Sequence, residues 1–335
     1  MFAKACQKAY RFTRPLIVNT RSVDGTVSSS LGTFFVVNPE GWVLTAGHLF
    51  DSYMQFRQDQ TKIKGVEEIN AKAPAGTEKV KLDPKWLTNH SFWWGWDGVR
   101  LADVYVNREI DVCLGRLEGF KPDMVSEYPV FRDPETMLPG TSICRTGFPF
   151  TNVAADFDEK CNAFRIRPGV LPIAFFPNDG IHTRNIITSQ SSKDGGYQVM
   201  YVETSTPGLK GQSGGPIFDT EGRIYAMQVR TNHMPLGFHP VSNFNGKEVV
   251  ENQFMTSASE STGRSCKTSC AISTSASGLS APRRTDRTIP STNDNNKVIC
   301  FTRLIYFNGI RRTGKMLSGG GADRHRAASG ACPFC

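Results

Sequence analysis

The sequence lacks any apolar run long enough to cross a membrane. Its most apolar stretches, such as Val170–Phe176, are short, and Pro172 interrupts this one, whereas a membrane-spanning helix needs about 20 apolar residues. The first fifteen residues hold four basic side chains and no continuous apolar core, so they do not resemble a secretory signal. These absences argue against a membrane partner and predict a non-secreted protein, which we expect in the cytoplasm.

An excess of basic charge is missing from most of the chain. The net charge is +8, from 39 Lys and Arg against 31 Asp and Glu, but 12 of the basic and only 4 of the acidic residues lie in 256–335. Residues 1–255 therefore hold 27 of each sign. An evenly charged body offers no electrostatic footprint for nucleic acid, so no nucleic-acid partner is expected for it. The basic tail keeps a nucleic-acid-associated protein as an alternative, although no recognition motif supports it.

The nine cysteines lack a regular disulfide spacing. An odd count without such a framework favours a reducing compartment. Cys113 and Cys144 lie inside apolar runs, where a free cysteine behaves as a small hydrophobic residue. The pairs Cys266–Cys270 and Cys332–Cys335 have the spacing of half zinc sites, but between them stand only one further Cys and one His, without ligand-pair spacing. We expect unpaired thiols in this part of the chain, and no metal or cofactor.

Short β segments separated by turn residues make up the body of the chain. Strand-like runs at 33–38 and 42–45 flank Pro39-Glu40-Gly41, and runs at 217–218 and 223–229 flank the polar turn 219–222. Long amphipathic helical periodicity is scarce. Many short strands with Gly and Pro turns favour antiparallel barrels or sandwiches.

Two segments depart from this pattern. Residues 51–100 hold four of the five tryptophans, and we interpret them as an insertion that packs its aromatic side chains over a barrel surface. A lid or binding patch near the site is the alternative. Residues 256–335 form a basic tail, rich in Ser and Thr over 256–293 and without an apolar period. Such a composition predicts disorder, and its abrupt start is also compatible with a shifted reading frame.

The segment Gly211-Gln212-Ser213-Gly214-Gly215 is the most informative in the sequence. A serine between glycines can present its hydroxyl beside exposed backbone N–H groups, as acyl transfer requires. The same letters fit the nucleophile elbow of an α/β-hydrolase, but that elbow needs a strand before the serine and a helix after it. Here a Pro-Gly pair precedes the segment and a hairpin follows. With His48 and Asp111 upstream, the chain order is His, Asp, Ser, one of those known for a catalytic triad.

These motifs together resemble the trypsin-like serine peptidase family, which has the chymotrypsin fold, and in style its bacterial and HtrA-type members, although no PDZ pattern follows. The resemblance covers about Leu16 to Gly237. The motifs that carry it are Gly32-Thr33-Phe34-Phe35-Val36-Val37, Thr45-Ala46-Gly47-His48, Asp111-Val112-Cys113-Leu114, Gly140-Thr141-Ser142-Ile143-Cys144 with Gly147-Phe148-Pro149, and Gly211-Gln212-Ser213-Gly214-Gly215-Pro216-Ile217-Phe218.

The resemblance implies a role for each site residue. His48 is the expected general base, Asp111 the carboxylate that orients it, and Ser213 the nucleophile. Asp97 and Asp103 compete for the carboxylate role, but Asp111 directly precedes an apolar strand, where the family places this residue. The oxyanion hole is expected from the loop 211–213 (Gly211, Gln212 and Ser213), with the Gly211 and Ser213 N–H groups as donors. Family members activated from a zymogen carry an acid where this chain has Gln212, so activity should not depend on that salt bridge.

The substrate pocket is expected along 206–210 and 228–232, with Thr206, Gln228 and Thr231 as lining residues. Thr206 and Gln228 are able to offer hydrogen bonds to a polar substrate side chain, or to serve as ordinary wall residues. No acid lies in 204–210, which argues against a preference for Lys or Arg. A Glu-specific pocket built on His233 and His239 is a further alternative.

The sequence as a whole predicts an all-β protein with two six-stranded antiparallel β-barrels and a disordered C-terminal tail. The peptidase domain is expected over 1–255, with a first barrel at about 16–120, a second at about 128–240 and the Trp-rich insertion at 51–100, and the tail over 256–335. The predicted function is a serine endopeptidase that acts on a peptide or protein substrate. A catalytically inert, peptide-binding relative of the same fold is the alternative.

Overall fold

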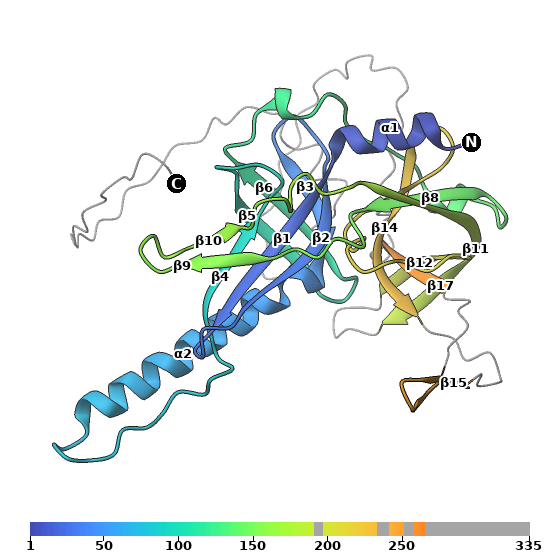
Figure 1. Cartoon of the computed structure of the whole chain (residues 1–335). Helices are drawn as coiled ribbons and strands as arrows, with labels where there is room; N and C mark the ends of the chain where they lie inside the picture. Colours follow the sequence, from blue (N-terminus) through green and yellow to red (C-terminus); the bar gives the residue numbers. More distant parts are fainter. Residues whose placement is uncertain (191–196, 233–240, 251–256, 265–335) are drawn as a thin grey trace, which may run out of the picture.

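The computed structural model describes residues 1–190, 197–232, 241–250 and 257–264. Two curled β-sheets lie side by side and hold most of the strand residues in these ranges (Figure 1). The predicted all-β architecture of two barrel-like sheets is thereby confirmed. The second sheet differs in detail, because it has seven strands and one of them pairs in parallel.

The first sheet is built from six strands that all pair antiparallel. Its bounds are β1 Thr13–Ser22, β2 Val27–Val36, β3 Trp42–Ala46, β4 Leu87–Trp93, β5 Arg100–Asn107 and β6 Val112–Glu118. The spatial order is β4-β1-β2-β3-β6-β5. The predicted hairpin across Pro39-Glu40-Gly41 joins β2 to β3, with Phe35 opposite Leu44, and Gly41 takes the left-handed conformation at φ 78° that favours glycine in such a turn.

The second sheet is built from the residues that follow. Its strands are β7 Val130–Phe131, β8 Ser142–Gly147, β11 Phe176–Gln190, β12 Tyr197–Thr204, β13 Pro216–Phe218, β14 Arg223–Asn232 and β17 Ser257–Arg264. The order is β13-β8-β11-β12-β17-β14-β7, and an additional β13–β14 pairing closes the sheet on itself. In the predicted β13–β14 turn, the carboxylate of Asp219 accepts the backbone N–H groups of Glu221 and Arg223 at 2.9 and 3.0 Å, which fixes the turn locally.

Strand β17 changes the expected extent of the tail. Residues 257–264 were placed in the tail by the sequence analysis, but they pair with both β12 and β14. These eight residues therefore belong to the second sheet. The remainder of the predicted tail, 265–335, lies outside the described residues, as do the Cys266–Cys270 and Cys332–Cys335 pairs.

Two small hairpins form sheets of their own. The first pairs β9 Ala155–Asp158 with β10 Ala163–Ile166, and the second pairs β15 Val241–Phe244 with β16 Lys247–Val250. Three 3-10 turns complete the regular structure: η1 Gly47–Phe50, η2 Pro122–Met124 and η3 Pro134–Thr136.

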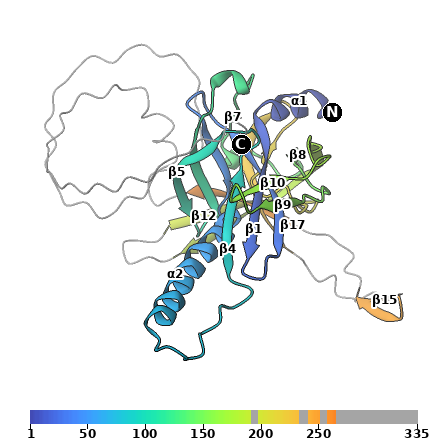
Figure 2. The same cartoon turned by 60° about the vertical axis from the view of Figure 1, so that its left-hand side comes forward.

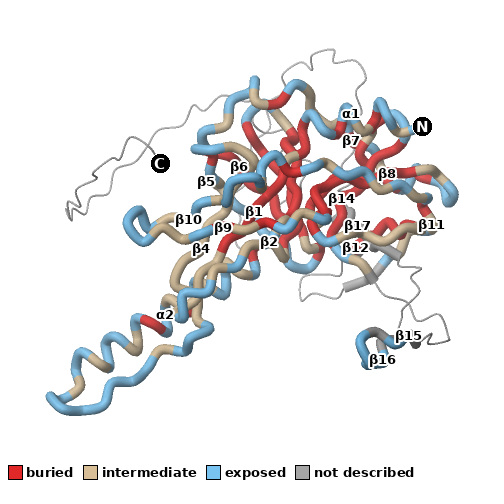
Figure 3. The backbone as a smooth tube through the Cα atoms, viewed as in Figure 1, coloured by how far each residue is buried: buried red, intermediate tan, exposed pale blue. Residues whose placement is uncertain are grey.

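Helix α1, Ala3–Phe12, was not expected from the sequence. Its buried residues are Ala5, Ala9 and Phe12, a spacing that puts them on one helical face. That face covers a hydrophobic cluster that draws on both sheets, with Phe35 from β2 and Phe218 from β13 among its members. Figure 3 shows the buried positions concentrated where the sheets lie against each other. The helix therefore packs over the junction of the two barrels.

The Trp-rich segment 51–100 begins with a second helix that the sequence analysis missed. Helix α2, Asp51–Lys72, extends away from the sheets (Figures 1 and 2) and buries only Asp59 and Ile63. The segment then returns as β4, which pairs with β1. It therefore supplies a strand of the first sheet as well as aromatic packing.

The expected packing role of the tryptophans is confirmed by Trp94. This side chain is 1% exposed and lies 5.1 Å from Phe34 and 6.3 Å from Phe50, ring centre to ring centre. Cys113 and Cys144 are each 1% exposed, so their expected apolar surroundings are confirmed too. No helix within the described ranges is long and apolar enough to span a membrane.

Candidate active site

The pairing of β3 with β6 brings His48 beside Asp111. Ala46, the last residue of β3, lies opposite Val112, the first residue of β6. The chain then turns into η1, and the Gly47 N–H donates to the Asp111 backbone carbonyl at 2.9 Å. A Cβ atom at Gly47 would lie 3.1 Å from Asp111 Oδ1, so a small residue is needed before the histidine.

The Asp111 carboxylate binds His48 through both oxygens. Oδ2 lies 2.8 Å from the ring nitrogen Nδ1, and Oδ1 accepts the His48 backbone N–H at 2.7 Å. Because a carboxylate only accepts hydrogen bonds, the ring proton is on Nδ1, and Nε2 of the neutral ring keeps its lone pair. Asp111 has φ 55°, a left-handed conformation that Asp tolerates better than most residues.

The two competing carboxylates are engaged elsewhere. Asp103 accepts from Arg116 Nε at 2.7 Å, and Asp97 accepts from the indole N–H of Trp93 at 2.9 Å. Of the three acids that the sequence offered, Asp111 is the one that the structure brings to His48.

The loop that carries Ser213 is tied to strands of both sheets. The Ser213 carbonyl accepts the Thr33 N–H of β2 at 2.8 Å, and the Thr33 hydroxyl donates to the Gly211 carbonyl at 2.7 Å. From the other side, the Gly214 N–H donates to the Gln228 carbonyl of β14 at 2.7 Å. These main-chain bonds position the serine at the junction of the two sheets.

Gly214 shows how closely this loop approaches the histidine. A Cβ atom there would lie 2.0 Å from the Thr33 carbonyl oxygen and 2.9 Å from the Ala46 nitrogen. Ala46 is two residues before His48, so the residue after Ser213 lies against the strand end that presents the imidazole. No hydrogen bond joins the Ser213 hydroxyl to His48 in the described part of the chain. In unliganded enzymes such bonds are often long and tighten only when substrate binds.

The loop 211–213 leaves two backbone donors available. Gln212, the loop residue between the two expected donors, uses its own N–H internally and donates to the Leu209 carbonyl at 2.9 Å. Within the described residues, no hydrogen bond occupies the N–H of Gly211 or of Ser213. Gly211 has φ 101°, and a Cβ there would lie 2.6 Å from the Phe148 carbonyl oxygen. Only glycine fits this position.

Comparison with known families identifies the chain. The family model of the trypsin-like peptidase domain matches residues 32–227, which is more than half of the chain and includes His48, Asp111 and Ser213. The chain belongs to the trypsin-like peptidase family. No curated protein matches it.

Solved structures similar to this chain include two of the HtrA-type protease AlgW. The structure with a decapeptide is 13% identical over 78% of this chain and 64% of the other, with a TM-score of 0.41. The structure with a tripeptide is 15% identical over 68% of this chain and 54% of the other, with a TM-score of 0.38. The chain therefore spans less than two thirds of the length of either structure.

The expected pocket residues are bound to one another and to their neighbours. Gln228 is 2% exposed, and its Oε1 accepts from Arg145 Nη1 at 3.0 Å while its Nε2 donates to the Arg230 carbonyl at 2.9 Å. The hydroxyl of Thr206 donates to the Asp179 carbonyl at 2.8 Å. These polar groups favour the wall-residue reading, because they are already engaged.

Thr231 is held in the same way, since its hydroxyl donates to the Gly208 carbonyl at 3.0 Å. Arg145 of β8 was missed by the sequence analysis, although it is 2% exposed and also bonds the hydroxyls of Thr204 and Thr206. The available signal was a lone charge inside an apolar strand. His233 and His239 lie outside the described residues.

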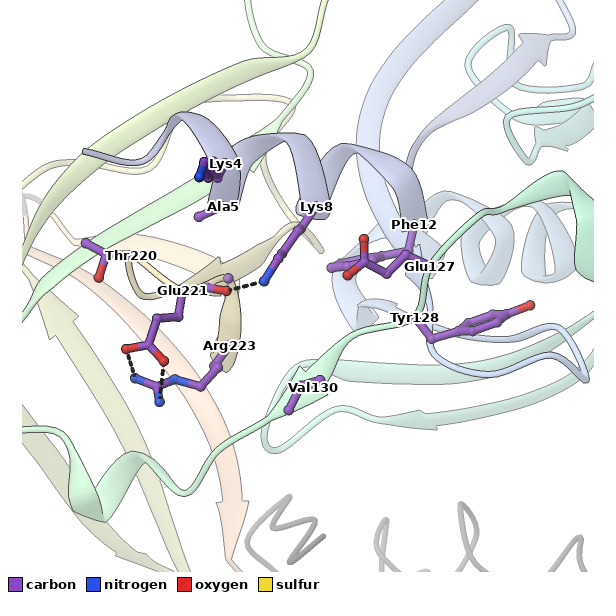
Figure 4. A pocket seen from close by; sticks show the side chains of 11 residues that line it. Lys4, Ala5, Lys8, Phe12, Glu127, Tyr128, Val130, Thr220, Glu221 and Arg223 are labelled. Carbon is purple, nitrogen blue, oxygen red and sulfur yellow. Dashed lines mark hydrogen bonds and ion pairs between the residues drawn. The ribbon is translucent and has the colours of Figure 1, made fainter.

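A separate groove of about 430 Å³ lies between α1 and the β13–β14 turn (Figure 4). Lys4 and Lys8 of the helix, Glu127, Glu221 and Arg223 supply its charged lining, and Lys8 Nζ donates to the Glu221 carbonyl at 3.0 Å. None of the residues that line it belongs to the candidate site. This groove is therefore not where peptidase chemistry is expected.

Proposed function

We propose that this protein is a serine endopeptidase that hydrolyses peptide bonds through an acyl-enzyme on Ser213. The observation that carries the proposal is the two-point binding of His48 by Asp111, at 2.8 and 2.7 Å, beside a serine loop anchored to Thr33. The His48 side chain is 38% exposed and that of Asp111 is 16% exposed, so the pair is open to an approaching substrate.

In the first half-reaction, the Ser213 hydroxyl oxygen attacks the carbonyl carbon of the scissile peptide bond. His48 Nε2 takes the hydroxyl proton as this bond forms. Asp111 accepts from Nδ1–H, which keeps the basic lone pair on Nε2 and stabilises the imidazolium that results. The negative charge on the former carbonyl oxygen is met by the N–H groups of Gly211 and Ser213. The carbon–nitrogen bond then breaks, and the leaving amine takes the proton from Nε2.

In the second half-reaction, water replaces the amine. His48 Nε2 removes a proton from the water molecule, whose oxygen attacks the acyl carbon. The ester bond to Ser213 breaks, and the serine oxygen recovers its proton from Nε2. The products are a free carboxylate and the regenerated enzyme, so this chemistry runs on the residues of the chain.

Gln212 bears on how the oxyanion loop is held. Its side chain is fully buried, and Oε1 accepts the Leu209 N–H at 2.9 Å. A further bond within the loop runs from the Gly215 N–H to the Gln212 carbonyl at 2.8 Å. These contacts support a loop shape maintained by the chain itself, so we propose activity without a zymogen-type salt bridge at this position.

The proposal is tested by labelling with a fluorophosphonate, which reacts only with an activated serine. Wild type, Ser213→Ala and Ser30→Ala are compared by intact mass, Ser30 being an exposed serine of β2. We expect one adduct on wild type and on Ser30→Ala and none on Ser213→Ala. Without the reagent, wild type and Ser30→Ala should both cleave members of a peptide library. A folded wild-type protein that takes no adduct contradicts the proposal and supports an inert peptide-binding relative.

A further inference from the structure

Phe150 combines two features that the fold does not need. Its side chain is 77% exposed, although burial is what normally stabilises an aromatic ring. Its backbone has φ 61°, a left-handed conformation that bulky residues rarely adopt. Such a conformation at an exposed aromatic residue points to a functional constraint, because strained backbone clusters at binding and catalytic sites.

A second ring holds Phe150 in position. Phe176, the first residue of β11, is 38% exposed, and its ring meets that of Phe150 edge to face at 5.2 Å and 84°. Phe176 is paired with Gly147 at the end of β8, three residues before Phe150. The two rings therefore form an apolar pair that is supported by the pairing of β8 with β11.

The loop that carries Phe150 lies directly against the proposed oxyanion loop. A Cβ atom at Gly147 would lie 2.7 Å from Gln212 Cα, and one at Gly211 would lie 2.6 Å from the Phe148 carbonyl oxygen. The Phe148 N–H also donates to the Gly211 carbonyl at 3.4 Å. The aromatic pair therefore stands next to the place where a scissile bond would be bound.

The neighbours of this loop indicate which half of a substrate would reach it. Phe148 belongs to the same hydrophobic cluster as Leu31, and a Cβ atom at Gly32, the next residue, would lie 2.5 Å from Leu49. Leu49 follows His48, the residue that would protonate the leaving amine. The acyl half is expected instead over the bonded wall of Thr206, Gln228 and Thr231. Phe150 and Phe176 thus share a flank with the histidine.

We propose that Phe150 and Phe176 together bind an apolar side chain on the leaving-group side of the scissile bond. The inference rests on the proposed function, and it adds a specificity determinant that the triad does not supply. Two rings at right angles present an edge and a face to an aliphatic or aromatic side chain. The fixed backbone at Phe150 reduces the ordering that binding would otherwise require.

Peptide substrates that share one acyl half and differ after the scissile bond test this assignment. One set carries Leu or Phe in the first two positions after the bond, and the other carries Gly there. Phe150→Gly removes the ring while tolerating the left-handed backbone, Phe150→Asn is a second variant that tolerates it, and Phe176→Ala removes the partner. Leu138→Ala is the matched control, because Leu138 is also 73% exposed.

We expect kcat/KM for the apolar set to fall about tenfold in the Phe150 and Phe176 variants, and that for the Gly set to stay within about twofold. Leu138→Ala should change neither. The rate of fluorophosphonate labelling should be unchanged in all variants, because the reagent carries no peptide on its leaving group.

Equal losses on both substrate sets would overturn the proposal, as would a wild type that does not distinguish them. Labelling separates this failure from that of the proposed function: a wild type that is labelled and cleaves peptides, but is indifferent to Phe150, leaves the peptidase assignment standing.

Discussion

Asp111 binds both the ring and the backbone of His48, through Oδ2 at 2.8 Å and Oδ1 at 2.7 Å. The two bonds leave the imidazole little freedom to rotate about its side-chain torsions. They also set the tautomer, since each carboxylate oxygen requires a donor. One carboxylate thus determines both where Nε2 points and that it carries the lone pair.

Asp111→Asn should therefore keep the position of the His48 ring and change its tautomer. The amide oxygen still accepts the His48 backbone N–H, and Asn tolerates the left-handed backbone at this position. Its NH₂ group then faces Nδ1, which places the ring proton on Nε2 and removes the base. We expect kcat to fall by about 10⁴-fold with little change in the unfolding midpoint. Asp103→Asn is the matched control, and comparable loss in that variant would contradict the assignment.

Gly214→Ala should disrupt the contact between the serine loop and the first sheet. The added Cβ would lie 2.0 Å from the Thr33 carbonyl oxygen, at a position with φ 85°. We expect the free energy of unfolding to fall by at least about 3 kcal/mol, because steric overlap adds to backbone strain. Gly140→Ala has a similar φ of 88° but open space around it, so it should lose only about 1–2 kcal/mol. Urea unfolding of both variants measures the difference, and equal losses would show that the contact is unimportant.

His90 should make stability depend on pH below neutrality. Burial lowers its pKa from 6.5 to about 4, in a site where it bonds the Ser52 hydroxyl at 3.0 Å and packs against Tyr53 and Phe92. Between these two pKa values the unfolded chain binds more protons than the folded one, so the free energy of unfolding falls as pH falls from about 6.5 to 4. Above pH 6.5 the contribution is constant.

The size of this effect is on the order of 1–2 kcal/mol, because solvent screens a half-buried ring. Urea unfolding of wild type and His90→Gln at pH 7.5, 5.5 and 4.5 measures this effect as the difference between the pH dependences of the two proteins' unfolding midpoints. The pKa of His182 is also lowered by burial, but this contribution is present in both proteins and cancels. Identical pH slopes in the two proteins would disprove the role of His90.

Cys6 and Cys144 should form a cross-link on mild oxidation. Their sulfur atoms are 3.9 Å apart, and the hydrogen bond to Cys144 lowers the pKa of the Cys6 thiol, which favours the reactive thiolate. Treatment with diamide, which takes up the two thiol hydrogens, should join them and raise the free energy of unfolding by about 2–4 kcal/mol. Peptide mapping identifies the bond. Cys6→Ser should abolish it and Cys161→Ser should not; a product that links other cysteines would contradict the expectation.

The parts of the fold that follow from short-range chemistry were predictable from the sequence. The β2–β3 and β13–β14 hairpins depend on turn residues such as Gly41 and Asp219, which act within a few positions. The His48 and Asp111 pair followed from motif order, because His48 follows one recognisable strand and Asp111 directly precedes another.

The parts of the fold that depend on contacts between distant residues were not predictable from the sequence. Helix α1 buries only three residues, Ala5, Ala9 and Phe12, among basic neighbours, and α2 has almost no buried face to create a periodic pattern. The β17 sequence is polar, and its pairing with β12 spans more than fifty positions. Phe150 was overlooked because a positive φ becomes visible only in three dimensions, and Arg145 because a lone charge in an apolar strand does not by itself reveal its hydrogen-bond partners.

The position of α1 over the junction of the two barrels also affects how this protein folds during synthesis. The helix leaves the ribosome before either sheet, yet its Lys8 bonds Glu221, 213 positions later, and the preceding residue Phe2 packs edge to face on Phe218. At about 5–20 residues per second, translation separates the two by roughly 10–40 s. During that interval the second barrel is incomplete, and the apolar face of α1 remains exposed. This face is therefore the surface of the nascent chain that needs protection from aggregation.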